Sequence, residues 1–118
     1  MKEATSNLPI LKGTLDMLVL KALSGGPMHG FGIALWLEQH STGQLELDDS
    51  LTYQVLHRLE GRGLIDAEWR VTSKNRRARL YTLNRAGHDH LGAEFQQWLR
   101  FSSVVTGIMT QTLHPHPG

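Results

Sequence analysis

The chain contains two segments that alternate apolar and polar side chains, joined by a short polar link. Residues 64–71 and 78–83 show the period-two pattern typical of β-strands, and the link 72–77 contains Asn75, a residue type that favours turns. The sequence therefore predicts an antiparallel hairpin. Basic residues without an intervening acid gather around its tip, so we expect it either to contact an anionic partner or to be a solvated tip. These residues are Arg70, Lys74, Arg76, Arg77 and Arg79.

Helical patterns occupy most of the remaining chain. Seven of the nine residues from 15 to 23 are apolar, which is more than a helix with one buried face needs. Because a domain this small covers one such face, a second copy of the chain is expected to cover the other. Residues 45–47 alternate like a short strand. The predicted helices cover residues 10–24 with Thr14 as N-cap, 28–42, 50–62 with Asp49 or Ser50 as N-cap, and 84 to beyond Met109.

The last predicted helix carries a seam of its own, spaced 4-3-4-3-4 like a coiled coil. A helix this long extends past a domain this small, so its seam also predicts pairing with another chain. The expected dimer interface consists of Leu15, Leu18, Leu91, Phe95, Trp98, Ser102, Val105 and Met109.

Composition excludes several classes of protein. The 118 residues suffice for one domain with tails, and the absence of cysteine rules out disulfide scaffolds, thiolate zinc fingers and cysteine nucleophiles. No apolar run approaches the ~18 residues that span a bilayer. The first seven residues lack the apolar stretch of a signal peptide, so we expect a soluble, cytoplasmic protein with no membrane contact.

The sequence shows no pattern of catalytic or metal-binding residues. A nucleophile elbow, a Walker loop and a dinucleotide fingerprint are all missing, so we expect no enzymatic activity. His88 and His90 are two residues apart, as are His114 and His116, whereas helical metal ligands stand four apart. We therefore expect neither a metal nor another cofactor.

The predicted helix 50–62 presents polar, aromatic and basic side chains opposite its apolar stripe, a surface suited to base edges and phosphates. Tyr53 and His57 have packing roles as alternatives. Gly30 at the start of the second helix suits either a phosphate or close packing of that helix against the first, and Lys12 suits either a phosphate backbone or plain solvent. The expected contacts with phosphates and base edges are Lys12, His29, Gly30, Ser50, Thr52, Tyr53, Gln54, His57, Arg58, Lys74, Arg76, Arg77 and Arg79.

The order of these elements is that of a winged helix-turn-helix followed by a dimerisation helix. The segments LKGTLD (11–16), GPMHGFGI (26–33), LHRLEGRGLI (56–65) and RRARLYTLNRAG (76–87) resemble the PadR family of bacterial transcriptional regulators, in its short form with one C-terminal helix. The resemblance implies a mainly α (α+β) fold and a homodimeric DNA-binding repressor. It also implies that the third helix enters the major groove of an inverted-repeat operator, with the hairpin as a wing on the backbone or minor groove.

One position departs from the family's pattern. The chain has Tyr53–Gln54 where the family commonly has Tyr-Pro. Glutamine can pair with adenine through two hydrogen bonds, so Gln54 either reads a base or restores the continuity of the helix.

Two further functions remain open at this stage. Trp98, Phe95 and Trp36 either line a cavity between the two protomers for a planar aromatic effector, as in some PadR relatives, or simply pack together in the interface. A dimerisation module without DNA binding explains the seam but not the basic hairpin. The expected organisation is an N-terminal arm (1–9), a winged helix-turn-helix domain (10–83), a dimerisation helix (84–112) and a flexible tail (113–118).

Overall fold

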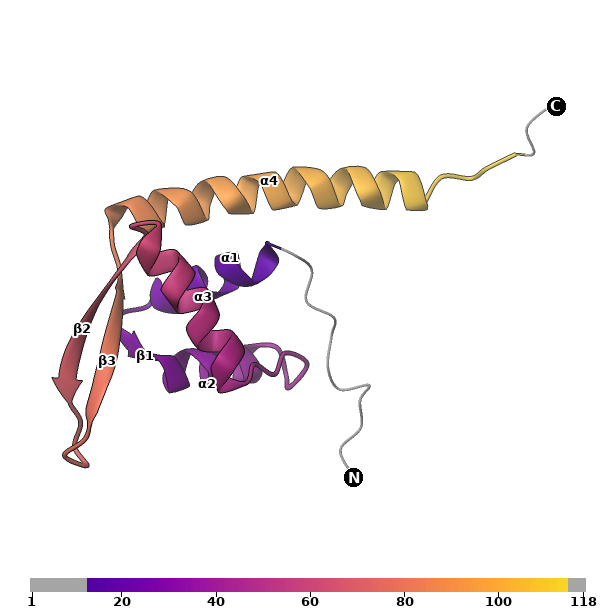
Figure 1. The fold of residues 1–118 in the computed structure, drawn as a ribbon. Helices are drawn as coiled ribbons and strands as arrows, with labels where there is room; N and C mark the ends of the chain where they lie inside the picture. The colour runs from indigo at the N-terminus through magenta and orange to yellow at the C-terminus, as the bar shows by residue number, and fades with distance from the viewer. Residues whose placement is uncertain (1–12, 115–118) are drawn as a thin grey trace, which may run out of the picture.

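The computed structural model describes residues 13–114, and a small antiparallel sheet forms one edge of its helical body (Figure 1). Strands β2 (Ile65–Val71) and β3 (Arg77–Leu83) pair with Trp69 opposite Arg79. The Thr72 N–H donates to the carbonyl of Arg76 at 2.7 Å, and Asn75 adopts the left-handed conformation with φ of 59°. Asparagine tolerates this conformation better than most residues. The predicted hairpin is confirmed.

A third strand, β1 (Met28–His29), lies where the sequence analysis predicts the first turn of a helix. That prediction is wrong, because these residues pair with the free edge of β3 and give a sheet of order β1-β3-β2. His29 strengthens the pairing through its Nδ1, which lies 2.9 Å from the carbonyl oxygen of Arg79. The strand predicted at residues 45–47 is also wrong, since both edges of β3 are already occupied and these residues lie in a loop.

The four predicted helices are present, with small differences at their starts. For α1, Gly13 is the N-cap with φ of 89°, and the predicted cap Thr14 is already helical. For α3, Asp48 is the cap, one residue before the predicted positions, and its Oδ1 accepts a 2.7 Å hydrogen bond from the N–H of Leu51. Such a cap satisfies a backbone donor that the helix itself leaves open. The helices are α1 (Thr14–Leu23), α2 (Gly30–His40), α3 (Asp49–Gly61) and α4 (Arg85–Met109).

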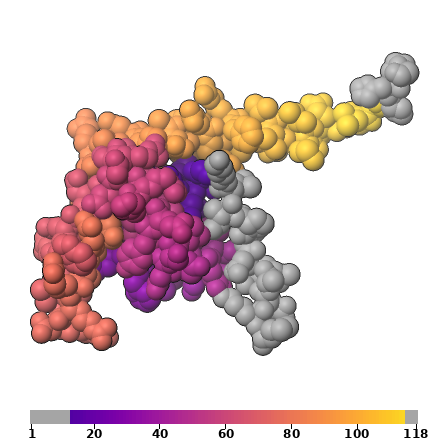
Figure 2. Space-filling model, in the orientation of Figure 1, coloured from indigo at the N-terminus to yellow at the C-terminus, as the bar shows by residue number. Residues whose placement is uncertain are grey.

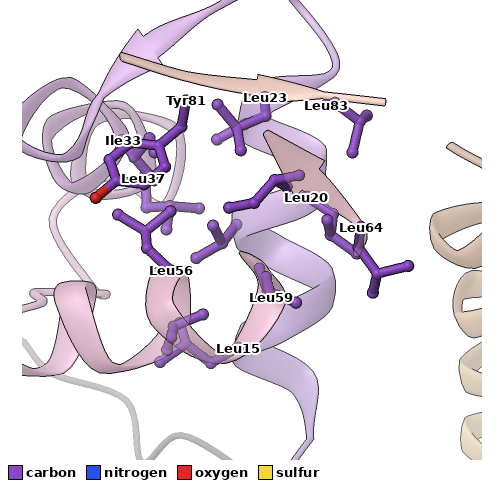
Figure 3. Packing of buried hydrophobic residues seen from close by; sticks show 14 residues of the cluster. Leu15, Leu20, Leu23, Ile33, Leu37, Leu56, Leu59, Leu64, Tyr81 and Leu83 are labelled. Carbon is purple, nitrogen blue, oxygen red and sulfur yellow. The ribbon is translucent and has the colours of Figure 1, made fainter. Parts of the chain in front are cut away.

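The hydrophobic core lies between the first three helices and the sheet (Figure 3). Helix α1 packs against α2, α3, α4 and β3, so most of its apolar surface is covered within one chain. Leu15 is only 6% exposed, and its predicted place in a dimer interface is therefore wrong. Leu18 is partly buried against the core and faces the underside of α4.

A tight corner fixes the start of α4 to the domain. Asn84 caps this helix by accepting from the N–H of Gly87 at 2.9 Å, and its Nδ2 donates to the carbonyl of Gly63 at 2.9 Å. Gly87 is buried against the Leu64 carbonyl. From this corner α4 crosses the domain and extends beyond it (Figures 1 and 2). None of the helices within residues 13–114 has the length and apolarity to cross a membrane.

Candidate nucleic-acid interface

The outer face of α3 presents most of the predicted contact residues. Ser50, Tyr53, Gln54 and His57 are exposed on it. Thr52, by contrast, is 1% exposed, and its Oγ1 donates to the carbonyl of Asp48 at 2.9 Å. Its predicted role as a DNA contact is therefore wrong: a helix of period 3.6 turns position 52 toward the same side as Val55 and Leu56.

Arg58, although half-exposed, is held by an ion pair with α1. Its Nε donates to Oδ2 of Asp16 at 3.2 Å, and its Nη2 donates to Oδ1. This hydrogen bond to a carboxylate raises the pKa of Arg58 above its usual value, against a smaller opposing effect of burial. Arg62 adds a longer contact of 3.5 Å to the same carboxylate. The guanidinium of Arg58 therefore ties α3 to α1, a partner that the sequence analysis missed because the two residues are 42 positions apart.

The hairpin and its turn form the wing, defined here as residues 65–83. Lys74, Arg76 and Arg77 are exposed at its tip, which stands apart from the helical body (Figure 2). Arg79 is half-buried, and its Nη2 donates to Oε2 of Glu60 on α3 at 2.9 Å. Arg70, on the other strand, pairs with Glu68 at 2.8 Å. The predicted basic patch is thus present, but two of its five cations already have carboxylate partners.

Trp69 on β2 contacts two basic residues of β3, Arg77 and Arg79, on one face of the wing. The guanidinium carbons of Arg77 and Arg79 lie 4.8 and 5.5 Å from the centre of its ring, within the range of cation–π contacts. Alternation along β3 places both arginines on one strand face, and this shared contact agrees with that. The sequence analysis did not name Trp69, although its alternation places it on that same face.

The start of α2 packs against the outer face of α3 at Gly30. A Cβ on Gly30 would meet the Tyr53 ring at 3.1 Å, so the absence of a side chain allows α2 to approach α3 closely. Gly30 therefore allows close packing, but against α3 rather than against the first helix as predicted. His29 points to the sheet, and Lys12 lies outside the described residues.

A groove of about 430 Å³ separates the wing from the starts of α2 and α3. Phe31, Tyr53 and Trp69 line it with exposed rings, and Arg77 and Arg79 supply positive charge. Helix α4 crosses the opposite side of the domain (Figure 1). One side of the molecule thus combines a polar helix face, a basic wing and an aromatic groove.

The predicted aromatic cluster is divided in the structure. Phe95 and Trp98 line an apolar pocket of about 380 Å³ with Leu18 and Leu91 between α1 and α4. Trp36 is not part of that pocket: its ring stacks on His40 at 3.9 Å between centroids, and it lines a separate hollow near Pro27. Within one protomer Trp36 therefore lies apart from Phe95 and Trp98.

Helix α4 exposes more apolar surface than its predicted seam contains. Beyond the body, Val105 and Met109 are exposed along the seam, with Ser102 partly covered. A second stripe, missed by the sequence analysis, consists of Phe101, Val104 and Ile108, each at least 60% exposed. Its spacing of three and four residues is itself a helical signal.

His90 on α4 has protein partners. Its Nε2 lies 2.9 Å from Oε1 of Glu94 and 3.2 Å from Nη2 of Arg62. Residues 13–114 bring together no group of three or more His, Asp and Glu side chains that could hold a metal ion.

A three-stranded sheet whose hairpin carries cations beside an exposed helix defines a DNA-binding protein of the winged helix-turn-helix class. The chain belongs to the transcriptional regulator PadR-like family, whose model matches residues 19–93. It is therefore a DNA-binding transcriptional regulator and not an enzyme.

Solved structures agree with this assignment. The chain is similar to a PadR family transcriptional regulator from Eggerthella lenta, with 26% identity, a TM-score of 0.77 and 86% of both chains covered. It is also similar to a PadR family transcription regulator from Clostridium difficile, with 25% identity, a TM-score of 0.69 and coverage of 82% of this chain and 99% of that one. A transcriptional regulator from Clostridium thermocellum shares the fold at 20% identity and a TM-score of 0.75, covering 81% of this chain and 93% of its own.

Proposed function

We propose that this chain is a homodimeric transcriptional repressor that binds an inverted-repeat operator with α3 in the major groove and the wing on the DNA backbone. The observation that supports this most is the shared orientation of the α3 polar face and the wing cations, on the side away from α4 (Figure 1). A duplex placed there meets hydrogen-bonding side chains and positive charge together. The expected site of action is the cytoplasm.

The contacts divide into two kinds. Gln54, Tyr53, His57 and Ser50 are exposed on α3 and are the proposed readers of base edges or adjacent phosphates. Lys74, Arg76 and Arg77 are the proposed phosphate contacts of the wing, where they bind without reading sequence.

The dimer is proposed to form through the part of α4 that extends beyond the body. Phe101, Val104 and Ile108 have exposures of 65, 60 and 65%, which is unusual for large apolar side chains on one helix. A second copy of α4 covers this surface most simply and gives a two-fold axis that an inverted repeat matches. Residues 10–83 then act as the DNA-binding domain and residues 84–112 as the dimerisation helix.

Binding is tested with a labelled duplex from upstream of the chain's own coding sequence, against a scrambled duplex, by fluorescence anisotropy across a salt series. We expect preferential binding with a steep salt dependence. Arg77→Ala removes one phosphate contact from each protomer of the dimer, so it should weaken binding to both duplexes and lower the salt slope by about 1.8. Gln54→Ala should mainly reduce the preference between them. Equal weakening of both duplexes by Gln54→Ala would refute its role as a base reader.

Oligomeric state is tested separately by sedimentation velocity. Ile108→Asp should shift the protein toward the monomer, while Ser103→Asp on the polar side of α4 should leave the dimer intact. A protein that dimerises but binds no duplex at low salt would instead be the dimerisation module.

A second candidate function rests on the apolar pocket between α1 and α4. Phe95 and Trp98 stand in its wall, and Lys21 lies at its rim, so a planar aromatic molecule is the proposed effector. Titration of tryptophan fluorescence with planar aromatics should show quenching that Trp98→Ala abolishes. An unchanged signal in the wild-type protein would mean that these rings only pack.

A further inference from the structure

The wing holds its two β3 arginines in different ways. Arg79 has an ion pair with Glu60 on α3, at 2.9 Å, and both side chains are 33% exposed. Arg77 has no ion pair with any carboxylate among residues 13–114, and its side chain reaches solvent. Trp69 contacts both arginines, since the guanidinium groups of Arg77 and Arg79 both lie over its ring.

We propose that Trp69 is a positioning residue for DNA binding, which holds Arg77 as the phosphate contact of this strand while Arg79 serves as a strut between wing and α3. The proposal rests on the function proposed above, in which the wing meets the backbone. It changes the sequence-based expectation that Arg77 and Arg79 act alike.

The charges favour this division of roles. The charge of Arg79 is already compensated by Glu60, so moving this side chain toward a phosphate would break an existing ion pair. Arg77 gives up no carboxylate on binding. A contact with phosphate is therefore more favourable for Arg77 than for Arg79.

The ring explains why Trp69 is exposed. Trp69 is 55% exposed, so burial stabilises this large apolar side chain only in part. A long arginine side chain loses rotamer freedom when it binds, and a ring that already holds the guanidinium reduces that loss. Trp69 also stands directly opposite Arg79 in the strand register, so the pleat of the sheet maintains the contact.

The experiment is a double-mutant cycle on Trp69 and Arg77, read as affinity for the duplex in the salt series described above. Trp69→Ala should weaken binding by the dimer roughly five- to thirtyfold, because each protomer loses one exposed cation–π contact. The salt slope should not change, because both cations remain. Trp69→Phe should retain most of the affinity. In the Arg77→Ala background, Trp69→Ala should have no further effect.

Several outcomes would overturn the proposal. An equal effect of Trp69→Ala with and without Arg77 would mean that the ring touches DNA itself or only supports the fold. Unfolding in urea, followed for each variant, separates those two cases. A salt slope that falls for Arg79→Ala as much as for Arg77→Ala would make Arg79 a phosphate contact rather than a strut.

The same series distinguishes failure of this inference from failure of the proposed function. If Arg77→Ala lowers the slope but Trp69→Ala has no effect, the wing binds DNA and the positioning role is wrong. If the wild-type protein binds no duplex, both proposals are wrong. If it binds and Arg77→Ala leaves affinity and slope unchanged, Arg77 is not a phosphate contact and this inference alone is wrong.

Discussion

Gly87 provides a direct test of the corner that orients α4. A methyl group in place of its hydrogen would overlap the backbone carbonyl oxygen of Leu64 and Cδ1 of Leu83. Because the obstacle is partly backbone, relief requires that the start of α4 move away from the α3–β2 link. Overpacking of this kind costs about 1–3 kcal/mol, and the upper end applies to a rigid neighbour.

Helix propensity acts in the opposite direction. Alanine stabilises a helix by about 1 kcal/mol relative to glycine. Set against an overpacking cost of about 3 kcal/mol, Gly87→Ala should lower the free energy of unfolding by a net ~2 kcal/mol. Gly61→Ala is the matched control, since a Cβ there meets nothing within 4 Å and should stabilise by about 0.5–1 kcal/mol.

Urea unfolding followed by circular dichroism, at one protein concentration for all variants, measures both changes. The two substitutions should differ in sign. If Gly87→Ala is as stable as Gly61→Ala, the contact between α4 and the Leu64 carbonyl does not constrain the fold and the reasoning fails.

Three further predictions concern single interactions. Asp16→Asn should lower the free energy of unfolding by about 1–2 kcal/mol in urea, because it removes the carboxylate between Arg58 and Arg62, whereas Asp89→Asn in the exposed pair with Arg85 should leave stability unchanged. Asp48→Ala should cost about 1 kcal/mol through loss of the α3 cap, and a cost no larger than that of Asp49→Ala would contradict this assignment. Burial raises the pKa of Tyr81, so above about pH 10 the unfolded chain releases a proton that the folded chain retains, and stability falls as pH rises; Tyr81→Phe should remove this part of the fall in urea titrations at alkaline pH, and parallel profiles would argue against it.

Periodic patterns predicted the elements of this protein well. The hairpin alternates with period two because one face of each strand meets the core, and that constraint appears directly in the residues. The starts and ends of the helices were predicted to within a few residues, since Asp, Gly and Pro act through their own backbone chemistry. The errors at Met28 and His29 and at residues 45–47 arose because pairing with an edge of β3 depends on tertiary position.

The candidate interface was predicted in part. The exposed face of α3 and the cations of the wing followed from composition and period, but Thr52 was assigned to the wrong side of its helix and Leu15 to the wrong surface. For Thr52 the helical period itself indicates the buried side, shared with Val55 and Leu56. For Leu15 the burial depends on how many elements surround its helix, which periodicity alone does not state.

The sequence by itself determined the secondary elements, the family and the positive charge of the wing, because each depends on local spacing or residue type. Only the tertiary structure decided which charges remain available to a partner. Ion pairs such as Arg58 with Asp16 and Arg79 with Glu60 join residues far apart in the chain, and their formation depends on distances of a few ångströms set by packing. The same packing left Arg77 beside the Trp69 ring and free of a carboxylate among the described residues.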